Sequence, residues 1–66
     1  MIRFSENLRE LRKDRGLRQS ELANKLSTTQ RKVSYWETGK IEPDIKDLWL
    51  LADFFGISID ELVGRE

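Results

Sequence analysis

The sequence has no cysteine and no histidine, and only one proline among its 66 residues. Without cysteine there is no disulfide framework and no thiolate metal site. Without histidine the chain lacks the side chain that most often acts as general base, zinc ligand or titrating group near neutral pH. These absences argue against hydrolytic or metal-assisted catalysis. We therefore expect a protein that is not an enzyme and that needs no metal and no cofactor.

Long apolar runs are also missing. The longest, LWLLADFFGI, is interrupted by Asp53 and is too short to span a bilayer. The start of the sequence, MIRFSENL, lacks the apolar centre of a signal peptide. We therefore expect a cytoplasmic protein with no membrane partner. The length suits a single domain, residues 1–66, near the lower limit for folding without disulfides or metals.

Charge is balanced overall but unevenly distributed. Residues 1–40 carry ten of the twelve Lys and Arg residues, whereas residues 41–66 carry seven of the twelve Asp and Glu residues. A chain divided in this way can present a basic face although its formal net charge is zero. The plain alternative is a set of charges scattered over a solvated surface.

Apolar residues recur at helical spacing, and no segment alternates as a strand would. The pattern predicts an all-α fold of five short helices. Phe4, Leu8 and Leu11 share one face of the first helix, and Gly16 ends it. The second helix covers about 19–26. The third covers about 29–38, with Thr29 as its N-cap.

The last two helices lie in the acidic half. Asp44 is placed to cap a helix that ends at Gly56, and Ser58 with Glu61 forms a capping box before a short final helix. The inward face of the helix after Asp44 is predicted to consist of the following residues: Ile45, Leu48, Leu51, Ala52 and Phe55.

The third helix has few core residues. At about 100° per residue, only Val33 and Trp36 define its inward side. Arg31, Tyr35 and Thr38 lie on the opposite side, with Gln30 and Lys32 on the flanks, and no acidic residue occurs from 30 to 36. Side chains of these types read base edges and phosphates.

The chain resembles the helix-turn-helix domains of the phage repressor and Cro family, also called the xenobiotic-response-element family. The resemblance runs from Phe4 to Val63. It is carried by LRELRKDRGL, QSELANKL, TTQRKVSYWETGK, the single Pro43 and the ending LADFFGISIDEL. It implies a compact repressor-like domain whose motif helices are 19–26 and 29–38, the second being a recognition helix in the major groove.

The resemblance also implies roles for individual residues. Gln30, Arg31 and Tyr35 match positions that contact base edges. Arg18, Gln19, Thr29, Lys32 and Lys40 fall where the family contacts the DNA backbone, and Gln19 would also brace the recognition helix. Arg12 matches the arginine that pairs with the glutamate at Glu37. Ser27 stands where the turn usually has glycine, and Arg18 replaces the usual Ser or Thr cap.

The fourth helix adds a predicted contact surface. Leu50 falls outside the inward face, and Trp49 and Phe54 flank it and are expected to be only partly covered. Exposed apolar side chains of this kind suggest a homodimer, and the alternative is that the last helix and the C-terminus cover them. The leading hypothesis is a regulator of transcription, expected to be a repressor, that binds a two-fold duplex DNA operator as a dimer. The alternative is an antitoxin or adaptor that docks a protein partner through this surface, since fold alone does not determine function.

Overall fold

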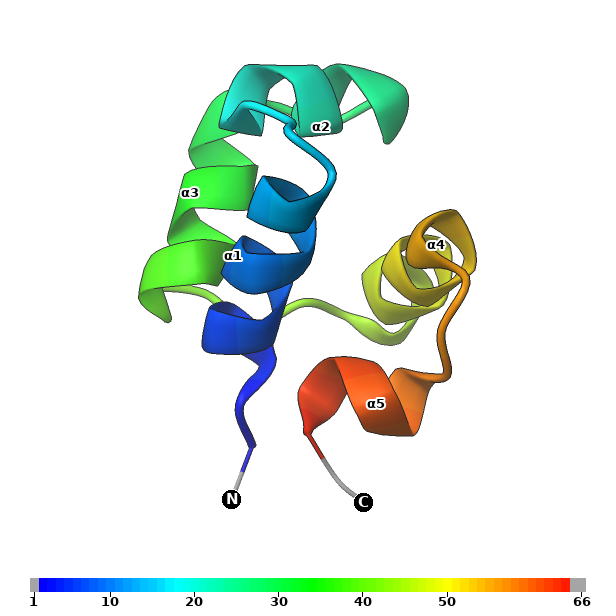
Figure 1. Cartoon of the computed structure of the whole chain (residues 1–66). Coiled ribbons are helices and arrows are strands. Elements are labelled where there is room, and N and C mark those ends of the chain that lie inside the picture. Colours follow the sequence, from blue (N-terminus) through cyan, green and yellow to red (C-terminus); the bar gives the residue numbers. More distant parts are fainter. Residues whose placement is uncertain (1, 65–66) are drawn as a thin grey trace.

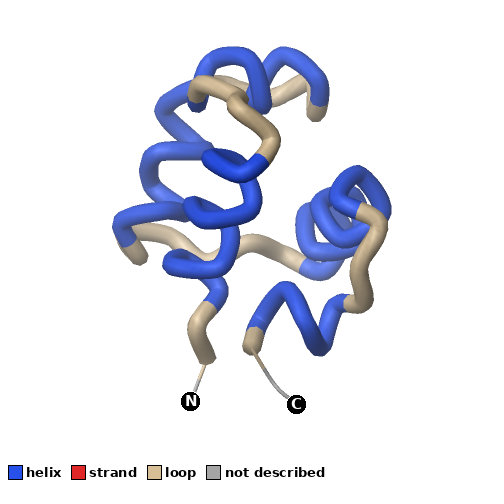
Figure 2. The backbone as a smooth tube through the Cα atoms, in the orientation of Figure 1, coloured by secondary structure: helices blue, strands red, loops and turns tan. Residues whose placement is uncertain are grey.

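The computed structural model of the chain describes residues 2–64. Within this range there are five helices and no strand, as predicted, and short loops join them (Figures 1 and 2). The helices are α1 (Phe4–Asp14), α2 (Gln19–Lys25), α3 (Gln30–Thr38), α4 (Ile45–Phe55) and α5 (Ile59–Val63).

The predicted caps set the helix boundaries. Hydroxyl oxygens of Thr29 and Ser58 accept hydrogen bonds from backbone amides at the starts of α3 and α5. At the start of α4, Asp44 Oδ1 accepts from the amide of Asp47 over 2.8 Å. This bond lowers the pKa of Asp44 from its ordinary value, because it stabilises the carboxylate. Gly39 ends α3 in the left-handed conformation that glycine adopts at little cost.

The core lies where the helices meet. α3 packs against α1 and α2, and α5 packs against α1 and α4. Val33 and Trp36 are buried as predicted, so the inward side of α3 was assigned correctly. The buried apolar side chains are Phe4, Leu8, Leu22, Ala23, Val33, Trp36, Leu51, Ala52, Phe55 and Leu62.

The prediction for Ile45 was wrong. Its side chain is 83% exposed, whereas Leu48, one turn further on, packs against the core. Ile45 is the first residue of α4, so the apolar periodicity begins there before the helix reaches the core. Together with Trp49, which is 58% exposed and lies four residues later, it leaves part of α4 apolar and open to solvent.

Polar contacts hold the first and last helices together. The amide of Arg3 donates to the carbonyl of Val63 over 2.8 Å, and Asn7 Nδ2 donates to the carbonyls of Glu61 and Leu62. At the other end of α1, Arg15 donates to the carbonyl of Phe55 over 3.0 Å. These bonds fix α1 against the α4–α5 half. None of the helices in residues 2–64 is long and apolar enough to cross a membrane.

Candidate nucleic-acid interface

The turn between α2 and α3 has a serine at the position where glycine is usual. Ser27 has a positive φ of 56°, in the left-handed region. The amide of Thr28 donates back to the carbonyl of Ala23 over 2.9 Å, and the amide of Ser27 donates to Asn24. These are the bonds of a Schellman turn. Ala23 itself is buried, and its small side chain lets α2 and α3 pack closely.

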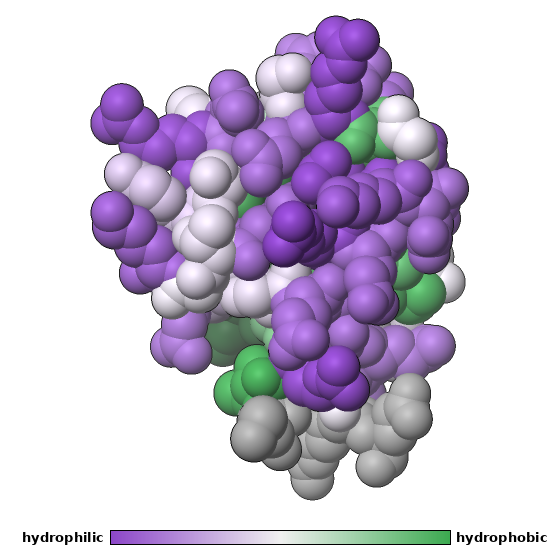
Figure 3. All heavy atoms as spheres, turned by 60° about the vertical axis from the view of Figure 1, so that its left-hand side comes forward, coloured by the Kyte–Doolittle hydropathy of each residue, from purple (hydrophilic) through white to green (hydrophobic). Residues whose placement is uncertain are grey.

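The turn leaves the outer side of α3 open. Gln30, Arg31 and Thr38 are exposed, and Tyr35 is half-buried. Figure 3 brings this side of the molecule forward and shows mostly hydrophilic side chains, with apolar ones only in small areas. The first turn of α3 contains no acidic residue. Its free amides and helix dipole therefore favour an anion, and no side chain of that turn opposes one.

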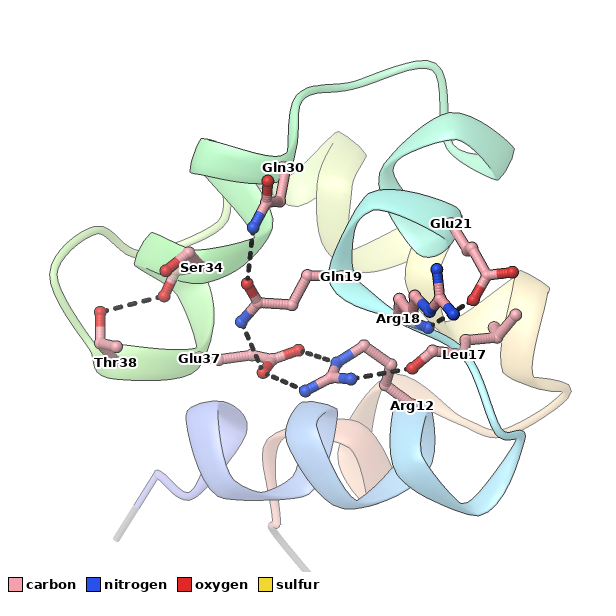
Figure 4. Close-up of polar contacts among 9 residues, drawn as sticks. All are labelled: Arg12, Leu17, Arg18, Gln19, Glu21, Gln30, Ser34, Glu37 and Thr38. Carbon is pink, nitrogen blue, oxygen red and sulfur yellow. Dashed lines mark hydrogen bonds and ion pairs between the residues drawn. The ribbon is translucent and has the colours of Figure 1, made fainter.

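The structure brings Arg12 of α1 and Glu37 of α3 together as an ion pair (Figure 4). Arg12 Nε lies 2.6 Å from Glu37 Oε2, and Nη2 lies 2.9 Å from Oε1. Nη1 also donates to the carbonyl of Leu17 over 2.8 Å. The hydrogen bond to Glu37 raises the pKa of Arg12. Because Glu37 is buried and paired, its charge adds little repulsion at the outer side of α3.

A chain of amide groups continues from this pair to the exposed face. Gln19 Nε2 donates to Glu37 Oε1 over 3.2 Å, and Gln30 Nε2 donates to Gln19 Oε1 over 3.3 Å. Figure 4 shows the four side chains in one continuous line from α1 to the start of α3. Gln30 keeps its carbonyl oxygen and a second amide hydrogen for another partner, which is what a bidentate contact to adenine requires.

Lys32 lies on the flank of α3, as predicted, and contacts α4. Its ammonium lies 3.3 Å from the carboxylate of Asp47 and 5.5 Å from the centre of the Trp36 ring. The reason is that the flank carrying Lys32 faces the start of α4, where Asp44 and Asp47 gather negative charge. A phosphate would have to compete with Asp47 for this lysine, so a backbone contact by Lys32 stays a prediction.

Three further residues predicted to contact the DNA backbone are exposed. The ammonium of Lys40 lies 4.9 Å from the centre of the Tyr35 ring, which places a cation beside the outer side of α3. Arg18 precedes α2 and is exposed. As predicted, its side chain forms no cap hydrogen bond, and its backbone amide donates to Glu21 Oε1 over 2.8 Å. Thr29 is also exposed, with its hydroxyl engaged as the α3 cap.

The three residues of the predicted dimer surface differ in accessibility. Trp49 is well exposed, whereas Leu50 and Phe54 are half-buried. Phe54 packs against the core and makes an edge contact with Phe55, with ring centres 5.0 Å apart. The open part of the surface is therefore centred on Trp49 and displaced toward Ile45.

The sequence alone did not indicate two contacts. The Lys32–Asp47 ion pair joins helices separated by a loop, and no local spacing relates the two residues. The bond between Gln19 and Gln30 depends on how closely α2 and α3 pack. Gln19 was expected to brace the recognition helix, but Gln30 was not predicted as its partner.

An exposed polar helix, held across a preceding helix by a tight turn, defines a helix-turn-helix protein. The helix-turn-helix family model matches residues 8–62, and the chain belongs to this family. The HTH-type transcriptional activator BcrR of Enterococcus faecalis is 37% identical over 65 residues, which are 98% of this chain and 32% of that protein. This chain therefore spans about a third of BcrR.

Solved structures agree with this assignment. A transcriptional regulator from Listeria innocua matches with a TM-score of 0.91 and 44% identity, over 97% of this chain and 60% of that one. The P22 c2 repressor, solved in complex with a synthetic operator, matches with a TM-score of 0.87 and 27% identity over 96% of both chains. These matches confirm the resemblance to phage repressors and the all-α repressor-like fold.

Proposed function

We propose that this chain is a sequence-specific duplex DNA-binding domain that regulates transcription. The proposal rests on the outer side of α3, which is exposed and has no acidic side chain facing solvent. There a series of hydrogen bonds, Arg12–Glu37–Gln19–Gln30, holds Gln30 in position before DNA binds. The similarity to a repressor solved with its operator supports it. Under this proposal α3 enters the major groove and the chain performs no catalysis of its own.

The side chains divide into two groups in this proposal. Gln30, Arg31 and Tyr35 contact base edges, with Arg31 suited to a bidentate contact to guanine. Backbone contacts come from Arg18, Gln19, Thr29 and Lys40, and from Lys32 where a phosphate displaces Asp47. Affinity then arises largely from released counterions, and specificity from the reading side chains.

In vitro selection from a random duplex library tests the proposal directly. We expect an enriched sequence, and we expect affinity for it to fall steeply as salt rises, because several phosphate contacts release counterions. Unrelated duplex should bind weakly in the same titration. The absence of an enriched sequence, or affinity that does not change with salt, would contradict the proposal.

Two single substitutions distinguish a side chain that contacts base edges from one that contacts the DNA backbone. Arg31→Ala is expected to cost about 1–3 kcal/mol of binding free energy and to relax preference at one base pair. Lys40→Ala should weaken all sequences to a similar degree and reduce the salt dependence by about one ion. Binding to every single-base variant of the selected operator provides the measurement. Parallel losses for both variants across all operators would show that the division is wrong.

The proposed regulator acts on a two-fold operator as a pair of chains in the cytoplasm. Two recognition helices can then reach half-sites about 34 Å apart on one side of the duplex. The apolar surface around Trp49, Leu50 and Phe54 is the proposed contact between the copies. Binding over a promoter would exclude polymerase, and so repression is the expected outcome.

A further inference from the structure

The exposed side of α4 carries four residues that can pair with the same four residues of a second copy of the chain. Lys46, Trp49, Leu50 and Asp53 fall within an arc of about 100°, opposite the buried Leu51 and Phe55. Lys46 and Asp53 are seven residues apart, so they lie two turns apart on one ridge. Both are exposed, and within residues 2–64 neither one forms an ion pair.

We infer that a second copy of this chain docks on this stripe, with the two α4 helices antiparallel about a two-fold axis between Trp49 and Leu50. This inference rests on the proposed pairing of copies and specifies its geometry. In that register Lys46 of each copy faces Asp53 of the other, at both ends of the contact. Each Trp49 lies beside Trp49 of the second copy, and Leu50 beside Leu50.

The alternative parallel register lacks this complementarity. There Lys46 would face Lys46 and Asp53 would face Asp53, and like charges facing each other are unfavourable. The other acidic residue in the middle of this region, Asp47, does not oppose the antiparallel register. It points toward α3 and is paired with Lys32 at 3.3 Å, away from the stripe. Charge therefore selects one orientation of two otherwise similar apolar contacts.

The position of α4 is compatible with DNA binding. Figure 1 shows α4 on the opposite side of the domain from α3, with no other helix beyond its outer side. Self-association there leaves the outer side of α3 uncovered. A contact over about two helical turns buries less than the roughly 1,200 Å² typical of stable complexes. We therefore expect a weak dimer that dissociates on dilution.

Exchange of the two charges tests the register without DNA. Lys46→Glu and Asp53→Lys each place like charges at both ends of the contact, so each should weaken self-association by at least about tenfold. Mixing the two variants in equal amounts creates a heterodimer in which both ends are again complementary. The mixture, and the double variant Lys46→Glu/Asp53→Lys, should therefore regain the association of the parent chain. Sedimentation over a range of concentrations measures all five samples.

Matched controls and a second readout make the outcome decisive. Lys25→Glu and Asp60→Lys alter exposed charges on α2 and α5 by the same amounts and should leave self-association unchanged. Circular dichroism checks that each variant is folded. A parent chain that stays monomeric, or a mixture no tighter than the separate variants, would overturn the inference. Binding to a single half-site should be equal for the parent and both variants, so failure of DNA recognition itself would appear separately there.

Discussion

Replacing Trp36 by alanine is expected to remove about 3–5 kcal/mol from the free energy of unfolding. Trp36 is 1% exposed and meets Phe4 edge-on, with ring centres 6.5 Å apart. Its removal leaves a cavity between α1 and α3, which a small domain cannot fill without moving its helices. Because domains are stable by only about 5–15 kcal/mol in total, and the smallest domains by the least, the variant should lose a large part of its stability. Urea or thermal unfolding followed by circular dichroism measures the loss.

Trp49→Ala is the matched control, because it removes the same side chain from an exposed position. At concentrations where the chain is monomeric, it should change the stability by only a few tenths of a kcal/mol. Trp36→Phe supplies a second comparison. Among the described residues the buried indole Nε1 of Trp36 has no hydrogen-bond partner, so Phe sacrifices no bond and should retain much of the stability. If Trp36→Ala melts at the same temperature as the parent chain, Trp36 is not a core residue. The side of α3 assigned to recognition would then be wrong.

Breaking the Arg12–Glu37 ion pair is also expected to cause a large loss in the free energy of unfolding. The side chains are only 11% and 3% exposed, so removing one leaves a buried charge without its counterion. We expect Arg12→Met or Glu37→Met alone to cost about 3–5 kcal/mol, and the double variant to cost far less than their sum. The charge on Arg12 will not vary over the neutral range, since its raised pKa lies far above it. The loss should therefore be independent of pH there.

The exposed pair of Arg3 and Glu6 is the control for this cycle. Its side chains are 57% and 67% exposed, and removing it by Glu6→Ala should cost less than about 1 kcal/mol. The double variant at positions 12 and 37 has a further readout. It removes the acceptor of Gln19, so preference at the base pair that Gln30 is proposed to contact should relax even where stability has recovered. Strict additivity of the two single losses would exclude the coupling.

Sequence reasoning succeeded where the determinant is local. Thr29, Asp44 and Ser58 cap their helices because a side-chain oxygen three residues before an amide needs no tertiary information. The periodicity of Val33 and Trp36 likewise fixed the inward side of α3. The same periodicity misplaced Ile45, because a helical wheel has no information on how far along a helix the core extends.

The candidate site was predictable in its residues but not in its connections. The exposed position of Arg31 follows from its angle on α3. Whether Lys32 extends to solvent or folds back depends on Asp47, which another helix positions. Long flexible side chains choose among several partners, and only the assembled fold determines which partner is nearest.

The placement of α1–α3 on one side of the domain and α4–α5 on the other has a kinetic consequence. Residues 2–40 carry ten basic and five acidic residues, whereas residues 41–64 carry one basic and six acidic, so the two sides have net charges of opposite sign and the domain has an electric dipole moment. Near a polyanion such a molecule experiences a torque before it experiences much net attraction. Encounters would then be pre-aligned by rotation, with α1–α3 turned toward the duplex, and the association rate would benefit from orientation more than from long-range capture.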